Sequence, residues 1–394
     1  MPGSVIVAGA RTPIGKLAGA LAGFAATDLG GFAIAAALQR AGVAPEDVEH
    51  VIMGQVLLAG AGQLPARQAA VNAGIPMSVP SSVVNKVCLS GLNAIYQADQ
   101  MIASGEADIV VAGGQESMTN APYLLPQARA GYRIGDGALV DSMMFDGLTC
   151  AFDHCAMGLA TERYGKGQAA LAREKQDACA AQSHERAASA QKDGRFADEI
   201  VAVAVPQRKG DPLMFDTDEG VRPGTTSESL SGLKAAFEKD GAITAGNASQ
   251  ISDGASAVVM MSKAEAERRG VQALGEVVAY GMVAGPDTSL LTQPSRAILK
   301  ALGRVGLTTS DVSLFEMNEA FAAVGLASMA DLGVSDEIVN VNGGAIALGH
   351  PIGASGNRLA LTLLHELRRR GGGLGAAALC GGGGQGDALV VRAY

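Results

Sequence analysis

Two cysteines of this chain stand in settings where a thiol could act as a nucleophile or a base. Cys88 lies in the stretch NKVCLSG, between a β-like run over 80–84 and a helical pattern that begins at Leu89. The free amides at a helix N-terminus favour a thiolate, and a thiolate can attack a carbonyl carbon and hold the acyl group. A lone cysteine is otherwise a small buried hydrophobe. The position of Cys88 therefore predicts a reactive thiol.

Cys380 follows the apolar run over 376–379 and precedes four consecutive glycines. The stretch from Gly381 to Gly386 fits G-x-G-x-x-G, which is typical of dinucleotide binding. That interpretation requires a following helix and a later acidic residue, but only eight residues remain after Gly386. The glycines instead predict a backbone that comes close to a substrate oxygen, where N–H groups can stabilise negative charge.

A histidine and an asparagine are the other candidates for chemistry. His350 lies in GGAIALGHPIGASG, where Gly349, Pro351 and Gly353 would restrict its backbone. An imidazole changes its charge near neutral pH and can exchange a proton with a thiol. Asn318 precedes a Glu-Ala-Phe sequence at the start of a helical pattern, so a helix N-cap is the alternative function for it.

The composition indicates a well-packed protein that acts on small molecules. Of 394 residues, 48% are hydrophobic and 18% are charged, which favours a large core over disorder. The net charge of −9, with a basic run only at 368–370, argues against nucleic-acid binding. No apolar run approaches the ~18 residues of a membrane span, and the start of the chain does not resemble a signal peptide. We expect a cytoplasmic protein without nucleic-acid or membrane partners.

The five cysteines are widely spaced and odd in number, which argues against a disulfide framework. His154 lies between Cys150 and Cys155, but this spacing matches no common zinc pattern. We therefore expect no metal site and free thiols, as in a reducing compartment.

Short β-branched runs alternate with longer Ala- and Leu-rich helical patterns, which predicts an α/β fold. The chain also repeats itself. Residues 33–55 resemble residues 297–319, and in the same order two later helical patterns open with Ser-Gly, at 90 and at 355. Such a repeat predicts two similar α/β units. Cys88 and His350 lie at equivalent strand-to-helix turns, so we expect these turns to face each other.

Residues 115–250 fall outside the repeat and contain loop-forming prolines. We predict an inserted region that forms substrate or oligomer contacts, with a plain surface excursion as the alternative. The expected organisation is an N-terminal unit over 1–270, which includes the insertion, and a C-terminal unit over 271–394.

Several stretches together resemble the thiolase superfamily: VAGARTPIGK at 7–16, NKVCLSG at 85–91, GNASQISDGA at 246–255, MNEAFA at 317–322, GGAIALGHPIGASG at 343–356 and CGGGGQG at 380–386. The resemblance runs along essentially the whole chain and is greatest to the acetyl-transferring branch. It implies duplicated thiolase-like α/β units in a layered αβαβα architecture with an inserted loop domain. It further implies coenzyme A thioesters as substrate and product, no other cofactor, and a homotetramer.

The resemblance also implies a role for each candidate residue. Cys88 would be the acylated nucleophile, and Cys380 the base that removes a proton from the acetyl methyl group. His350 would activate Cys88 and contribute to an oxyanion hole. Asn318 would hold a water that, with the histidine, stabilises the enolate. Gly382 would supply a backbone N–H beside that of Cys88 for the acyl-enzyme oxygen.

The same resemblance implies a binding site for coenzyme A. Ser249 corresponds to a serine that contacts pantetheine, and Arg222 to a basic residue near the nucleotide end. The pantetheine and acyl tunnel would be lined by Leu148, Met157, Phe237 and Phe321. One departure concerns the substrate loop, where the family's His-Met-Gly is here Ala156-Met157-Gly158, and it leaves the acyl-size preference open.

The reaction expected from the resemblance is acetyl-CoA C-acetyltransferase activity. Two acetyl-CoA molecules condense reversibly to acetoacetyl-CoA plus coenzyme A through an acyl-cysteine intermediate. One alternative is a longer-chain 3-ketoacyl-CoA thiolase of fatty-acid β-oxidation, which shares the same catalytic residues. Another alternative, from a different class, is a non-catalytic acyl- or lipid-binding relative, which would lack one of them.

Overall fold

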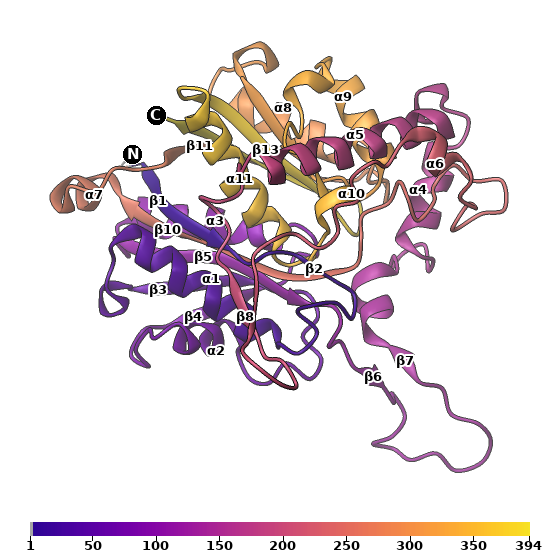
Figure 1. Cartoon of the computed structure of the whole chain (residues 1–394), viewed down its shortest axis with the longest axis horizontal. Helices are drawn as coiled ribbons and strands as arrows, with labels where there is room; N and C mark the ends of the chain where they lie inside the picture. The colour runs from indigo at the N-terminus through magenta and orange to yellow at the C-terminus, as the bar shows by residue number, and fades with distance from the viewer. Residues whose placement is uncertain (1–2) are drawn as a thin grey trace.

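The computed structural model describes residues 3–394, and one long sheet organises them (Figure 1). The ten-stranded sheet has the order β12-β13-β14-β11-β1-β10-β5-β3-β4, with β2 paired to β10. Two residue pairs, Val5 with Glu276 and Ile6 with Gly275, join β1 to β11 near the middle. The sheet therefore has two halves with a narrow seam between them.

The N-terminal half of the sheet is built from β1, β10, β5, β3 and β4. Here β10 is antiparallel to both β1 and β5, and β3 is parallel to both β5 and β4. The elements of this half are β1 (Ser4–Arg11), β2 (Gly15–Lys16), α1 (Ala26–Ala41), β3 (His50–Gly54), α2 (Pro65–Asn72), β4 (Ser81–Val84), α3 (Ser90–Ser104), β5 (Ile109–Ser117), β10 (Ser252–Ser262) and α7 (Lys263–Arg269).

The C-terminal half repeats this order and these directions. Here β14 is antiparallel to β11 and β13, and β12 is parallel to β13. An isolated parallel bridge between Phe315 and Val339 takes the place that β4 has in the other half. The elements of this half are β11 (Gly275–Ala284), α8 (Gln293–Arg304), β12 (Leu314–Met317), α9 (Ala322–Leu332), α10 (Ala345–Leu348), α11 (Ser355–Arg369), β13 (Gly373–Gly381) and β14 (Gln385–Ala393).

Helix-ending signals recur at equivalent places in the two halves. Gly42 follows α1 with φ 62°, and Gly306 follows α8 with φ 70°. Glycine suits this left-handed region because it has no Cβ to clash. A 3₁₀ turn comes next in each half, at Pro45–Asp47 and Thr309–Asp311, and leads into β3 or β12. The predicted duplication is confirmed.

Five layers result from these two halves. α1 and α2 cover the outer face of the N-terminal half, and α8 and α9 cover the outer face of the C-terminal half. α3 and α11 pack against each other between the halves. Their apolar side chains, among them Leu92, Ile95, Leu359 and Leu363, belong to one buried cluster. The predicted αβαβα architecture is confirmed.

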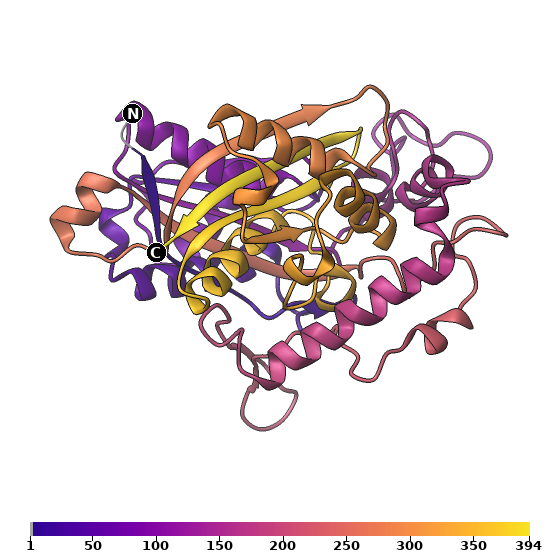
Figure 2. The same cartoon turned by 90° about the horizontal axis from the view of Figure 1, so that it is seen from above.

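The insertion lies between β5 and β10 and spans residues 118–251. Figure 2 shows its long helix α5 lying along one side of the body. Figure 1 shows residues 123–141, which we call the arm, extending away from the body. Leu125, Ile134 and Leu139 on the arm are strongly exposed. The elements of the insertion are β6 (Tyr123–Leu124), β7 (Val140–Asp141), α4 (Met157–Gly165), α5 (Arg173–Lys192), β8 (Val203–Val205), β9 (Leu213–Phe215) and α6 (Ser227–Ser231).

The central strand β10 has little strand signal in the sequence. β10 has the sequence SDGASAVVMMS and is buried along its whole length. Strands that are buried on both faces lack the alternation that marks a half-buried strand. The small residues at its start add no β-branched signal, so sequence reasoning did not find it.

Candidate active site

The loop that carries Cys88 connects β4 to α3 and is strained. Val87, directly before the cysteine, has φ 52°, a left-handed value that is unfavourable for a β-branched residue. The Ser90 hydroxyl accepts from the Lys86 N–H at 2.8 Å and donates to the Val87 carbonyl at 2.6 Å. α3 begins at Ser90. These bonds hold the strained backbone and place Cys88 just before the helix N-terminus.

Cys380 lies near the end of β13 and is 1% exposed. It pairs with Gly386 of β14, and the two strands are joined by residues 382–384. Gly383 and Gly384 have positive φ values of 79° and 67°. Glycine is favoured in that region, so the glycine run makes a tight hairpin turn beside the sulfur. The glycine run is followed by a strand and not by a helix, which agrees with the prediction that it is not a dinucleotide-binding loop.

His350 lies in the turn between α10 and α11 and is buried. The main-chain N–H of His350 donates to the Gln250 carbonyl at 3.0 Å, and Gly349, the residue before it, has φ 112°. A Cβ at Gly349 would lie 2.3 Å from the Ser252 hydroxyl. Glycine is therefore required for the imidazole to reach its position.

The hydrogen bonds of His350 favour one neutral form. The Ser355 hydroxyl lies 2.6 Å from His350 Nδ1 and also donates to the Pro351 carbonyl at 2.9 Å. Since a hydroxyl has one proton, Ser355 accepts from Nδ1 when it donates to Pro351. His350 Nε2 then carries a lone pair and faces Asn318 Nδ2 at 3.3 Å. All three hydrogen bonds are satisfied when the imidazole proton is on Nδ1.

Asn318 is not a helix N-cap. α9 begins at Ala322 and its N-cap is Phe321, so Asn318 lies in the extended turn after β12. The main-chain N–H of Asn318 donates to the Ala378 carbonyl at 2.9 Å. Its Oδ1 is buried and finds no hydrogen-bond partner within residues 3–394. An unpaired acceptor beside a histidine is a place where a water molecule would be held.

Both sulfurs and the imidazole line one small cavity. Its volume is about 60 Å³, and its walls include Cys88, His350, Cys380 and Gly382. Cys88 comes from the N-terminal half, whereas the other three come from the C-terminal half. The structure thus brings together residues that the sequence places almost three hundred positions apart.

Three glycines, Gly54, Gly91 and Gly114, allow the halves to approach each other behind these residues. A Cβ at Gly114 would lie 2.1 Å from the Gly353 carbonyl, and one at Gly54 or Gly91 would lie 2.8 Å from the same oxygen. Such distances are not found for real Cβ atoms, and the obstacle is backbone. The close contact between the Cys88 helix and the His350 turn therefore depends on missing side chains.

A larger cavity adjoins the small one. Its volume is about 500 Å³, and Met157, Ser249, Phe321 and His350 line both cavities. The residues predicted to contact coenzyme A all line the larger cavity, namely Leu148, Met157, Arg222, Phe237, Ser249 and Phe321. The larger cavity therefore leads from the surface to the thiols.

The chain matches one protein family in two blocks. Residues 4–264 match the model described as "Thiolase, N-terminal domain", and residues 271–393 match "Thiolase, C-terminal domain". The chain belongs to the thiolase family. This thiolase is 60% identical over 388 residues to the "Probable acetyl-CoA acetyltransferase" of Mycolicibacterium smegmatis, which covers 98% of this chain and 100% of that relative. Proteins named "Acetyl-CoA acetyltransferase" from Cupriavidus necator and Chromobacterium violaceum are 52% and 51% identical, over 98% of both chains.

Burial dominates the electrostatics of the thiolase site. Burial raises the pKa of the Cys88 thiol to about 12, despite the nearby helix N-terminus. Burial, assisted by the charge of Arg358, lowers the pKa of His350 to about 3. Burial and the neighbouring Cys88 likewise raise the pKa of Cys380. Burial therefore works against the thiolate that the helix N-terminus favours at Cys88, and a neutral imidazole adds no positive charge beside it.

Sequence reasoning missed some residues that line the larger cavity of this thiolase. Lys16 lies at the exposed mouth with Arg222, which makes it a second basic group there. Lys16 closes the VAGARTPIGK stretch, so its motif was visible, but the sequence did not show which side chain faces the cavity. Gln250 also lines the cavity and donates to the carbonyls of Gly220, Ile346 and Ala347.

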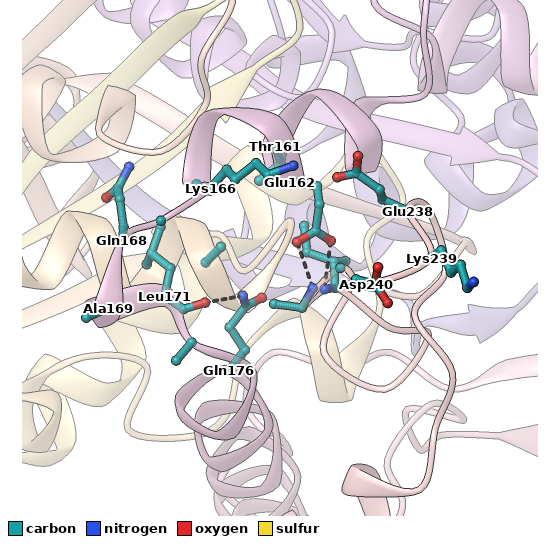
Figure 3. A pocket seen from close by; sticks show the side chains of 17 residues that line it. Thr161, Glu162, Lys166, Gln168, Ala169, Leu171, Gln176, Glu238, Lys239 and Asp240 are labelled. Carbon is teal, nitrogen blue, oxygen red and sulfur yellow. Dashed lines mark hydrogen bonds between the residues drawn. The ribbon is translucent and has the colours of Figure 1, made fainter.

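A third cavity, of about 600 Å³, lies beside α4 and the loop over 238–243 (Figure 3). Glu162 accepts there from the N–H groups of Ala242 and Ile243, and Gln176 donates to the Leu171 carbonyl (Figure 3). Neither cysteine of the small cavity lines it. It is separate from the thiolase chemistry described above.

Within residues 3–394, no helix has both the length and the apolar character needed to cross a membrane.

Proposed function

We propose that this chain is an acetyl-CoA C-acetyltransferase that forms acetoacetyl-CoA from two acetyl-CoA molecules, and catalyses the reverse reaction. The observation that carries the proposal is the single cavity lined by Cys88, Cys380 and His350. The larger cavity offers room for the pantetheine arm. Full-length relatives at 50–60% identity bear this name, which supports the same reaction here.

In the first half-reaction, Cys88 Sγ bonds to the carbonyl carbon of acetyl-CoA while its proton passes to His350 Nε2. The N–H groups of Cys88 and Gly382 stabilise the carbonyl oxygen as it becomes negative. The bond between carbon and the coenzyme A sulfur then breaks, and that sulfur takes the proton from His350. The products are acetyl-Cys88 and free coenzyme A.

In the second half-reaction, Cys380 reacts through its minor thiolate form, since burial raises its pKa, and removes a proton from the methyl group of a second acetyl-CoA. His350 and a water held by Asn318 stabilise the enolate oxygen. The enolate carbon attacks the acetyl carbonyl on Cys88, and the bond from that carbon to Cys88 Sγ breaks. Cys88 Sγ takes the proton from Cys380, which restores both sulfurs.

Ser355 suits both half-reactions. The hydroxyl proton of Ser355 can rotate. The hydroxyl therefore accepts from Nδ1 when Nδ1 carries a proton, and donates to Nδ1 when it does not. His350 can therefore present a lone pair at Nε2 to the Cys88 proton and an N–H to the enolate. The 2.6 Å contact between Ser355 Oγ and Nδ1 supports this role.

Intact-mass measurement after incubation with acetyl-CoA tests the proposal. We expect one acetyl adduct per chain, which Cys88→Ser abolishes. The Cys179→Ser variant is the control, since Cys179 does not line the small cavity. Absence of the adduct in the unmodified chain would reject the enzymatic function and favour a non-catalytic acyl-binding relative.

A longer-chain 3-ketoacyl-CoA thiolase is the second candidate. The small volume of about 60 Å³ beside the sulfurs, walled by Leu148, Met157 and Phe321, favours a short acyl group. Turnover of acetoacetyl-CoA compared with 3-ketohexadecanoyl-CoA separates the two. A preference for the long chain would replace the acetyl assignment.

We also propose a homotetramer in which the arm contacts other copies. The exposed Leu125, Ile134 and Leu139 support this, because a projecting apolar segment is typical of an interface. Size-exclusion chromatography with light scattering tests it. A variant with residues 126–138 replaced by a short Gly-Ser linker should form a smaller assembly, whereas a monomeric parent chain would reject the proposal.

We further propose two sequence units, 1–270 with the insertion and 271–394, in a cytoplasmic protein. The limits of the two family matches support the division. Free cysteines support a reducing location, and cell fractionation tests it.

A further inference from the structure

An ion pair connects the two segments that carry the reactive sulfurs. Lys86 Nζ lies 2.7 Å from Asp387 Oδ1 and 2.8 Å from Oδ2. Lys86 is two residues before Cys88, and Asp387 lies on β14 opposite Leu379, next to the pair of Cys380 with Gly386. The contact therefore bridges the nucleophile loop of one half and the Cys380 hairpin of the other.

We propose that the Lys86–Asp387 pair is a positioning device that sets the Cys88 loop against the Cys380 hairpin. The proposal rests on the function proposed above, because it concerns the geometry of that reaction. Lys86 does not line the cavity that holds the sulfurs. It acts through Cys88 and is a positioning residue.

The strained backbone at Val87 needs contacts that keep it in place, and the ion pair is one of them. A β-branched residue at φ 52° is stable only when its surroundings hold it there. Three hydrogen bonds remain within the loop. The Ser90 hydroxyl accepts from the Lys86 N–H and donates to the Val87 carbonyl, and the Asn85 side chain accepts from the Val87 N–H. The Lys86 side chain instead extends to the other half, so it relates the loop to Cys380.

Asp387 is a fixed partner for Lys86. Its side chain is fully buried and also accepts from the Tyr280 hydroxyl on β11 at 2.5 Å. The Tyr280 ring stacks on Tyr96 of α3, with ring centroids 4.4 Å apart. The carboxylate is therefore oriented by two elements besides Lys86, and a shift of Lys86 would not be followed by Asp387.

The positioning role and a purely structural role predict different outcomes. In Lys86→Met, the buried Asp387 carboxylate loses its counter-charge, which destabilises the fold. In Lys86→Met/Asp387→Asn, no charge is left unpaired, and the asparagine retains a partner for Tyr280. We expect the double variant to regain most of the lost Tm. A structural role alone would restore activity together with Tm.

The test measures Tm, kcat and acetylation of Cys88 in the parent chain, Lys86→Met and the double variant. We expect kcat to fall by about 10²-fold in both variants, because misplacement by about 1 Å has such an effect. Lys86→Arg, which keeps the charge and can reach the carboxylate, should retain most of kcat. Recovery of both Tm and kcat in the double variant would overturn the proposal.

Arg173→Met is the matched control. The Arg173–Asp177 pair has nearly the same burial, 22% and 2% exposed against 21% and 0% for Lys86–Asp387, and does not line the small cavity. We expect it to lower Tm with little change in kcat. If kcat fell as much in Arg173→Met as in Lys86→Met, the loss would result from lower stability alone, and the proposal would be overturned. A parent chain that forms no acetyl adduct would instead reject the proposed function.

Discussion

The two halves of the sheet differ most in how equivalent strands are connected. In the N-terminal half, residues 118–251 lie between β5 and β10, whereas in the C-terminal half residues 382–384 join β13 to β14. The long connection contributes most of the predicted coenzyme A contacts, and the short one contributes Gly382 beside Cys380. Under the proposed function, the long connection thus serves binding, and the equivalent short connection serves chemistry beside Cys380.

This difference agrees with the physical demands of the two tasks. A long surface connection can be extended at small entropic cost and can shape a cavity for a large ligand. Reactive atoms must instead be held within fractions of an ångström, which a tight hairpin on a buried sheet provides. The chemical groups accordingly lie at the ends of strands and helices, near the seam between the halves.

The largest effect should come from the short connection. Cys380→Ser replaces the proposed base by a weaker one, so exchange of the methyl protons of acetyl-CoA should fall by about 10²–10⁴-fold. Acetylation of Cys88 should persist. Deuterium incorporation measured by mass spectrometry, with Cys179→Ser as control, checks this. Unchanged exchange in Cys380→Ser would remove Cys380 from the role of base.

The contact between β5 and the His350 turn should be nearly as sensitive. In Gly114→Ala, the new Cβ would lie 2.1 Å from the Gly353 carbonyl, so the free energy of unfolding should fall by about 1–3 kcal/mol or more. Gly325→Ala on α9 is the control, because nothing lies within 4 Å of its Cβ position. Thermal or urea unfolding measures both. Equal stability of the two variants would show that the halves are not tightly apposed.

The long connection should affect binding more than turnover. Phe237 lines the larger cavity but not the small one, and its ring lies 6.2 Å from that of Phe321. Phe237→Ala should raise KM for acetyl-CoA by about tenfold with kcat nearly unchanged, since it removes apolar contact made equally before and during reaction. Leu213→Ala, exposed elsewhere in the insertion, is the control. A loss confined to kcat would contradict the division of tasks.

The smallest effect requires no substitution. Because the pKa of Cys88 is raised to about 12, its thiolate fraction should keep rising with pH throughout the range in which a free thiol titrates, near about 8.5. The rate of alkylation of Cys88 by iodoacetamide should therefore increase about tenfold per pH unit across that range. Peptide mapping measures this rate. A plateau near the ordinary value would show that the site is more hydrated than its burial indicates.

The sequence predicted two similar α/β units because the signals for them are local, whereas the layered αβαβα arrangement was implied by the family resemblance. Gly42 and Gly306 mark equivalent helix ends, and the Ser-Gly pairs at 90 and 355 mark equivalent helix starts. The predicted starts of α3 and α11, at Leu89 and Ser355, are within one residue of those observed.

Other features depend on the fold and were beyond the sequence. The raised pKa of Cys88 results from burial by segments distant in the chain. Asn318 resembles an N-cap in sequence, and only the extended turn before Ala322 shows that it faces His350. The Lys86–Asp387 pair joins residues on different halves: Lys86 lies within NKVCLSG, but nothing in the sequence shows that its partner is Asp387.

The shared layer of α3 and α11 makes the two halves inseparable as folding units. Leu92 and Ile95 are shielded within the same cluster as Leu359 and Leu363. A fragment that stopped before β11 would leave these side chains of α3 facing water, and an apolar patch of this kind promotes aggregation. Attempts to split the chain, or to exchange one half with that of a relative, must therefore redesign this central layer as a whole, even though the sequence is repetitive.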